Sequence, residues 1–170
     1  MTEIELGYAV IACLITAWLA LPLHVAVHEF SHAIAARLLT ASPISIQLGN
    51  QIHGVWRHGS LELSFGLTRW KTGSFKFSPH EFAPWKQALV IAAGPCGTFA
   101  LTFLFMMGLL SANNTLQQIA LLPPTIYGLK ILILSLYPTE IKDRETGKTI
   151  ESDGLKLSRI PWKAPSHANT

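Results

Sequence analysis

Residues 6–39 read LGYAVIACLITAWLALPLHVAVHEFSHAIAARLL, an apolar run that ends in a cluster of two histidines and a glutamate. Residues 6–27 contain no Asp, Glu, Lys or Arg. Two further apolar runs, residues 88–110 and 119–137, contain one charged residue between them, Lys130. About 20 apolar residues are enough for a helix to cross the hydrocarbon core of a bilayer. The sequence therefore predicts three membrane-spanning helices.

The composition agrees with a membrane protein and excludes a disordered or fibrous chain. Of the 170 residues, 49% are hydrophobic and 14% are charged, and the mean hydropathy is +0.34. The polar segments between the apolar runs are too short to build a second soluble core. We expect an α-helical polytopic membrane protein in which residues 1–160 form a single membrane-embedded domain. Its spans are expected at about 6–39, 84–110 and 116–138, with a flexible tail at 161–170.

Two stretches differ from plain membrane helices. Within residues 43–78, apolar and polar residues alternate over the short stretches 44–48, 61–65 and 74–77, which Gly-containing turns separate. This pattern predicts a small antiparallel β-sheet between the first two helices. In the third apolar run, Pro123 and Pro124 predict an interruption of the helix.

The basic residues are distributed unevenly between the two sides of the predicted membrane. The formal net charge is +3 and the isoelectric point is near 9.0. No Lys or Arg precedes the first span or lies in the connection 111–118, whereas residues 40–87 and 139–163 carry many. Membrane topology explains this basicity, so we expect no nucleic-acid partner. The positive-inside rule places the N-terminus outside, and the long loop and the C-terminus in the cytoplasm.

His28-Glu29-Phe30-Ser31-His32 matches the pattern H-E-x-x-H. Residues four apart share one face of a helix, so both imidazoles can reach one zinc ion with Glu29 alongside. Zinc with an open coordination position lowers the pKa of bound water to about 7, and Glu29 is placed to act as general base and then acid. This is the chemistry of peptide hydrolysis. The alternative is that the three residues form the wet cytoplasmic end of a span, although ionisable groups within a membrane are functional candidates by default.

A zinc site of this kind needs a third ligand, which must be Cys, His, Asp or Glu. Asp153 is the leading candidate, since Ser152 can cap a helix that begins with Asp153 in its first turn. An ordinary cap on a solvated tail explains the same residues equally well from spacing alone. The other candidates are Glu140, Asp143, His53 and His58.

Two more ionisable residues lie inside the predicted spans. His24 extends the spacing of His28 and His32 by four residues, but one helix face cannot easily aim three imidazoles at one ion. We therefore expect His24 to pack or to form a hydrogen bond. Lys130 is expected to snorkel to the membrane surface or to pair within the helix bundle.

Several motifs together resemble the site-2 protease family of intramembrane zinc metalloproteases. They are HEFSH on a membrane helix, the strand-forming residues 43–78, Gly94-Pro95 in the next helix, and Ser135-Leu136-Tyr137-Pro138 followed by Asp153-Gly154. The resemblance covers nearly the whole chain and implies a three-transmembrane-helix metalloprotease core. It implies one zinc ion per chain with His28, His32 and Asp153 as ligands, and Glu29 as the catalytic acid and base.

The resemblance also implies partners and a location. The substrate is expected to be a membrane-anchored protein that is cleaved near the cytoplasmic face. The strand-like alternation within residues 43–78 indicates that an exposed edge of the sheet can pair with this substrate in extended form. We expect an integral, multi-pass protein of a bacterial cytoplasmic membrane, with the lipid bilayer as its other partner.

The sequence departs from the family pattern in three places. Thr98 stands where the family motif G-P-x-x-N has Asn, and Ser135 stands where N-x-x-P begins with Asn. Both residues offer a hydroxyl in place of an amide for positioning the substrate. Residues 139–152 separate Pro138 from Asp153. These departures leave a second hypothesis open, a catalytically inactive metalloprotease-like membrane scaffold or regulatory binding protein.

Overall fold

The computed structural model describes residues 3–77, 83–142 and 149–162, and within them three long helices dominate. They are α1 (Glu3–Leu39), α2 (Pro84–Leu110) and α3 (Thr115–Leu136). All three are long and apolar enough to cross a membrane, as the sequence predicts. Of the expected tail, residues 163–170 lie outside the described part.

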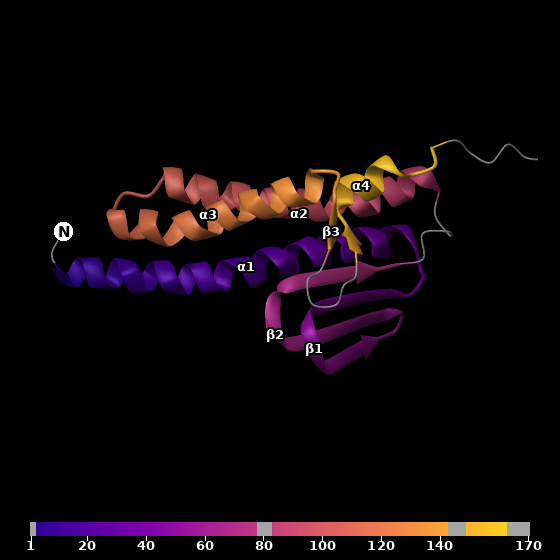
Figure 1. The fold of residues 1–170 in the computed structure, drawn as a ribbon, viewed down its shortest axis with the longest axis horizontal. Coiled ribbons are helices and arrows are strands. Elements are labelled where there is room, and N and C mark those ends of the chain that lie inside the picture. Colours follow the sequence, from indigo (N-terminus) through magenta and orange to yellow (C-terminus); the bar gives the residue numbers. More distant parts are fainter. Residues whose placement is uncertain (1–2, 78–82, 143–148, 163–170) are drawn as a thin grey trace, which may run out of the picture.

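The helices form a bundle with a small sheet attached to one side. Figure 1 shows α2 and α3 along one side of α1, and the β1–β2 sheet along the other side of the C-terminal half of α1. The bundle turns large apolar side chains outward, among them Trp18, Leu104 and Ile133, which are 78%, 67% and 64% exposed. An apolar exterior of this kind suits lipid as the solvent.

The helix α3 continues through Pro123 and Pro124, so the predicted interruption is wrong. Both prolines lack the N–H that a helix uses for its internal hydrogen bonds. Membrane helices tolerate such positions where neighbouring side chains satisfy the freed backbone groups. The carbonyls freed by the two prolines are those of Ile119 and Ala120, one turn earlier. Next to the prolines, the ring of His24 from α1 forms a hydrogen bond of 2.9 Å with the carbonyl of Pro124. His24 therefore forms the hydrogen bond that its position predicts.

The sheet consists of two long, bent strands, β1 (Ile44–His58) and β2 (Leu61–Lys76), in place of three short ones. Their segments lie side by side in the order 54–58, 61–65, 44–48 and 73–76. The two outer pairs run antiparallel as expected, but the central pair, 44–48 with 61–65, runs parallel. The chain reverses twice, within β1 at Gly49 and Gln51, which have positive φ, and again at Gly59, whose φ is 57°, and 61–65 inserts between the two halves of β1.

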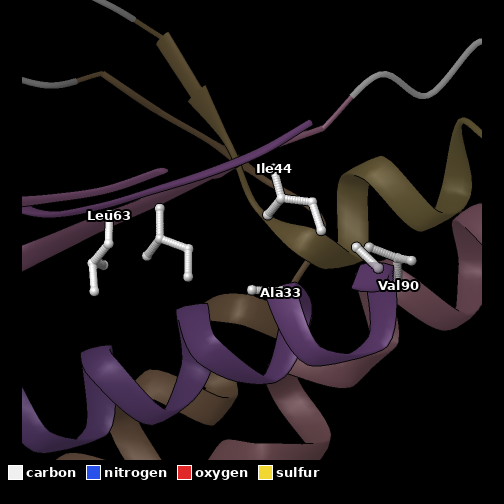
Figure 2. Close-up of a cluster of buried hydrophobic side chains, with 6 residues drawn as sticks. Ala33, Ile44, Leu63 and Val90 are labelled. Atoms are coloured by element: carbon white, nitrogen blue, oxygen red, sulfur yellow. The ribbon is translucent and has the colours of Figure 1, made fainter. Parts of the chain in front are cut away.

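The best-buried apolar side chains lie where the sheet meets α1. Figure 2 shows Ala33 of α1, Ile44 and Leu63 of the sheet, and Val90 of α2 converging in one cluster. Ile46 and Ala36, both 0% exposed, belong to it as well. Full burial of an Ile or Leu side chain contributes about 1.5–3 kcal/mol. The cluster therefore fixes the sheet against the turn of α1 that also carries His32.

Strands β3 (Glu140–Lys142) and β4 (Thr149–Glu151) pair antiparallel as the β3–β4 hairpin, and β4 leads into α4 (Asp153–Ser158). Ser152 closes the hairpin: its N–H donates to the Thr139 carbonyl, and its Oγ donates to the Tyr137 carbonyl at 2.7 Å. The same Oγ accepts from the Leu155 N–H, which confirms Ser152 as the N-cap of α4. The inserted residues therefore return the chain to the end of α3.

Candidate metal centre and active site

Three side chains that are remote in sequence converge between α1 and α4. His28 and His32 lie one helical turn apart on α1, and Asp153 is the first residue of α4. Their donor atoms all lie within 4.8 Å of one another, and in the described part of the chain they form the group that can hold a metal ion. The side chains of His28, His32 and Asp153 are 12%, 6% and 6% exposed.

The distances between these donor atoms fit a tetrahedral metal ion. His28 Nε2 lies 2.9 Å from Asp153 Oδ2 and 3.2 Å from His32 Nε2, and His32 Nε2 lies 3.4 Å from the same Oδ2. Zinc bonds of about 2.0–2.1 Å in a tetrahedron place neighbouring ligand atoms roughly 3.3 Å apart. Two imidazoles and one carboxylate are also a donor set that zinc accepts, with a fourth position left for water. The residues therefore fit zinc in both geometry and chemistry.

The outer nitrogen of each imidazole has its own hydrogen-bond partner. His32 Nδ1 lies 2.7 Å from the Val90 carbonyl of α2. A carbonyl only accepts, so Nδ1 carries the hydrogen and Nε2 of the neutral ring keeps its lone pair. His28 Nδ1 lies 3.0 Å from Thr98 Oγ1, also on α2, and Thr98 is 0% exposed. Such outer partners fix the tautomer and the ring orientation of a metal-binding histidine.

A glycine on α2 makes room for the histidines. A Cβ atom at Gly94 would lie 2.2 Å from His32 Nε2, closer than such contacts occur. The helix α2 therefore approaches α1 closely because residue 94 has no side chain. This gives a physical role to the Gly94-Pro95 pair that the sequence singles out.

Glu29 lies beside the three converging groups on the side of the sheet. It is 8% exposed and lies against Gly73 of β2, where an added Cβ would be 2.7 Å from Glu29 Oε1. A carboxylate that borders a candidate metal centre is suited to exchange a proton with water.

All four groups border one cavity of about 520 Å³. Its walls come from α1, residues 72–77 at the end of β2, Ile91 of α2, α3, and the β4–α4 segment. Ser135 on α3 lines this cavity, and its hydroxyl donates to the Leu132 carbonyl at 3.0 Å. Glu29 and Ser135 therefore border the same cavity.

The charge of Asp153 is stabilised by its surroundings. Burial by itself raises the pKa of Asp153, but its polar contacts with His28 and His32 and the nearby charge of Lys156 outweigh burial and hold the pKa well below its ordinary value. The second oxygen, Oδ1, lies 3.2 Å from Lys156 Nζ, one turn along α4. Asp153 therefore presents an anionic oxygen, Oδ2, to the two imidazoles.

The other candidates for a third ligand lie elsewhere. Glu140 forms an ion pair of 3.0 Å with Arg159, His58 is exposed and stacks on Trp56, and His53 is exposed in β1. Asp143 lies outside the described residues.

Several partners of the site were not predicted from the sequence. The contacts of the Val90 carbonyl and of Gly73 cannot be recognised in the sequence. Every residue has a backbone carbonyl, and a glycine does not indicate which side chain will pack against it. Lys156 has a signal, since it lies three residues after Asp153 and such a spacing places both on one face of a helix.

Comparison with known proteins agrees with this geometry. The profile of one family, described as peptidase family M50, matches residues 16–157, from the first helix into α4. No curated protein matches the chain in a sequence comparison. The matched region contains the H-E-x-x-H helix, the sheet, Gly94 and Asp153. The chain therefore belongs to peptidase family M50, the site-2 protease family of membrane metalloproteases.

Proposed function

We propose that this protein is an intramembrane zinc metalloendopeptidase that hydrolyses a peptide bond of a membrane-anchored protein near the cytoplasmic face. The observation that carries the proposal is the convergence of His28, His32 and Asp153 at distances that suit one tetrahedral zinc ion, with Glu29 beside them. One zinc ion per chain is proposed. Residues 1–160 act as one membrane-embedded domain.

The residues divide the work of hydrolysis between them. His28, His32 and Asp153 would hold zinc, which supplies a polarised water and a Lewis acid for the substrate carbonyl. Glu29 would accept the proton of the attacking water and deliver it to the leaving amine. Thr98 would keep the His28 ring in place through Nδ1. Ser135 would contribute a hydroxyl to substrate positioning from the wall of the cavity.

The sheet offers a way to hold an unwound substrate. Residues 73–76 pair with 45–48 on one side and also line the cavity with Glu29. An extended peptide added along the other side of 73–76 would lie beside the cavity that His28, Glu29 and His32 also line. A substrate with N-methylated backbone amides next to the scissile bond should then be cleaved much more slowly than its unmethylated form. Equal cleavage of both substrates would exclude strand pairing.

The proposed orientation places the basic loop and the C-terminal segment in the cytoplasm of a bacterial cell. The metal centre lies near that side, because His28 and His32 follow the apolar residues 6–27 and Asp153 follows the end of α3. Accessibility of single cysteines placed at residues 53 and 113 to a membrane-impermeant reagent tests this orientation. Residue 113 should react from outside and residue 53 only after the membrane is opened.

The decisive test of the proposed chemistry is Glu29→Gln, which removes the proton acceptor but keeps the shape of the side chain. Purified Glu29→Gln protein should bind as much zinc as wild type and should lose cleavage of a reconstituted membrane-anchored substrate by a factor of 10² or more, in line with the roughly 10²–10⁴-fold contribution of general acid–base catalysis. A Glu29→Gln protein with full peptidase activity would refute the assigned role.

The same variant distinguishes the second hypothesis, a catalytically inactive scaffold or regulatory binding protein. The replacement of two family asparagines by Thr98 and Ser135 motivates it. A scaffold would keep its cellular activity in the Glu29→Gln form, whereas a peptidase would lose it.

A further inference from the structure

Lys130 is a charged residue on the lipid-facing side of a membrane helix. It is exposed and lies inside the span Thr115–Leu136. Within the part of the chain that the structure describes, no hydrogen bond, ion pair or aromatic contact is made by Lys130. The expected pairing of Lys130 within the bundle is therefore not found among these residues. An unpaired ammonium group in a bilayer is costly and calls for a partner.

The depth of Lys130 follows from its neighbours along α3. Gly128 touches His24, since a Cβ there would lie 2.5 Å from His24 Cε1. Ile131 lines the cavity of the metal centre. Lys130 therefore lies at a level between His24 and the metal centre. It is six residues before Leu136, about 9 Å from the end of the helix at ~1.5 Å per residue.

The face of α3 that carries Lys130 extends to the cavity of the candidate metal centre. Ile126, Lys130 and Leu134 are spaced four residues apart and share one helix face. Ile126 is 53% exposed and Leu134 is 44% exposed. Leu134 also lines the cavity beside Glu29. The three residues thus form an exposed stripe, called here the Lys130 stripe, that ends at the mouth of the cavity.

We propose that the Lys130 stripe is a docking surface for a transmembrane helix that carries an Asp or Glu side chain within the membrane. The apolar residues on either side of Lys130 suit a helix as neighbour, and the ammonium group selects a carboxylate by charge complementarity. This proposal rests on the proposed peptidase function for one point, that the docked helix is the substrate. Its acidic residue would then lie about one helical turn deeper in the membrane than the bond to be cleaved.

Binding of a transmembrane peptide and its cleavage are measured separately. The docking surface and the peptidase function can then be refuted independently of each other. The probes are fluorescent Leu/Ala-rich transmembrane peptides that carry Glu, Gln or Lys about 9 Å from the end of their apolar segment, the depth of Lys130 in α3. Energy transfer reports their association with labelled Glu29→Gln protein in phosphatidylcholine vesicles at pH 8. Cleavage of the same peptides is measured with the wild-type residue at position 29.

The Glu peptide should bind about tenfold more tightly than the Gln peptide, a difference of the size expected for one polar contact between membrane helices. Lys130→Met should abolish this preference, and Lys130→Glu should transfer it to the Lys peptide. Lys86→Met, which removes a lysine near the start of α2, should change nothing. Unchanged zinc content will show that each variant is folded.

Equal binding of the Glu and Gln peptides would overturn the proposal and indicate that Lys130 reaches the lipid headgroups. Cleavage of both peptides at equal rates would likewise overturn it while leaving the peptidase function intact. A Glu preference in binding without any cleavage would support the docking surface and contradict the peptidase function.

Discussion

The hydrogen bond between Thr98 and His28 is the residue-scale feature that best explains this site. Thr98 occupies the position of an asparagine in the family motif, and its hydroxyl lies 3.0 Å from His28 Nδ1 in a fully buried setting. The short side chain of Thr98 therefore brings its hydroxyl directly to the His28 ring. The replacement therefore suits an outer partner of a metal ligand.

Replacing Thr98 by Val keeps the shape of the side chain and removes its hydroxyl. His28 Nδ1–H would then lack an acceptor in a buried site, and loss of such an outer partner typically lowers metal affinity by about 10–100-fold. Zinc competition with a chelating dye measures this change. Thr16→Val removes a hydroxyl that bonds only within α1 and should leave zinc affinity unchanged. Equal affinities of the Thr98→Val and wild-type proteins would contradict the role of Thr98.

At the scale of elements, the geometry of the candidate metal centre depends on how closely α2 approaches α1. Gly94 faces His32 Nε2, and Val90, one turn earlier, supplies the carbonyl for His32 Nδ1. Both contacts come from the same face of α2. A change in the distance between α1 and α2 would therefore shift the ring of His32, a proposed zinc ligand.

Gly94→Ala should abolish or strongly weaken zinc binding, because the new methyl group would lie 2.2 Å from His32 Nε2. Elemental analysis of the purified variant measures the bound zinc. Gly108→Ala is the matched control on the same helix, since its Cβ would meet the nearest atom, Leu121 Cδ1, at an ordinary 3.4 Å. A Gly94→Ala protein with normal zinc affinity would show that the helices can separate without loss of the site.

The elements also show what the sequence can and cannot predict. The three spans follow from the length of the apolar runs, a local property, and α2 begins and ends where the sequence places it. The parallel pairing of 44–48 with 61–65 depends on contacts between distant segments and has no local signal. The interruption expected at Pro123 and Pro124 is absent because membrane helices tolerate proline when they are packed against neighbouring helices, which the local sequence does not reveal. His28 and His32 are recognisable by spacing, whereas spacing alone left Asp153 undecided.

At the scale of the whole molecule, the converging ligands join the two ends of the fold. His28 and Asp153 are 125 residues apart in sequence. Between them lie the sheet, two membrane helices and the β3–β4 hairpin. A metal ion bound to both would connect α1 with α4 and close the cavity on one side.

Metal removal should therefore destabilise the protein. A ligand that binds only the folded state adds about 2.7 kcal/mol of stability at a free concentration of 100 times its Kd. Chelation should lower the melting temperature in detergent, and added zinc should restore it. Asp153→Ala protein should melt at the same temperature with and without zinc. A wild-type protein that melts identically in both conditions would show that no such connection exists.

The central claim is that His28, His32 and Asp153 bind one zinc ion. The most direct test is the zinc content per chain of the detergent-purified protein, with His28→Ala, Asp153→Ala and Glu29→Gln alongside. The account predicts about one zinc ion per chain in the wild-type and Glu29→Gln proteins, and little or none in the two alanine variants. Wild-type protein without zinc under metal-replete conditions, or full zinc content in Asp153→Ala, would contradict it.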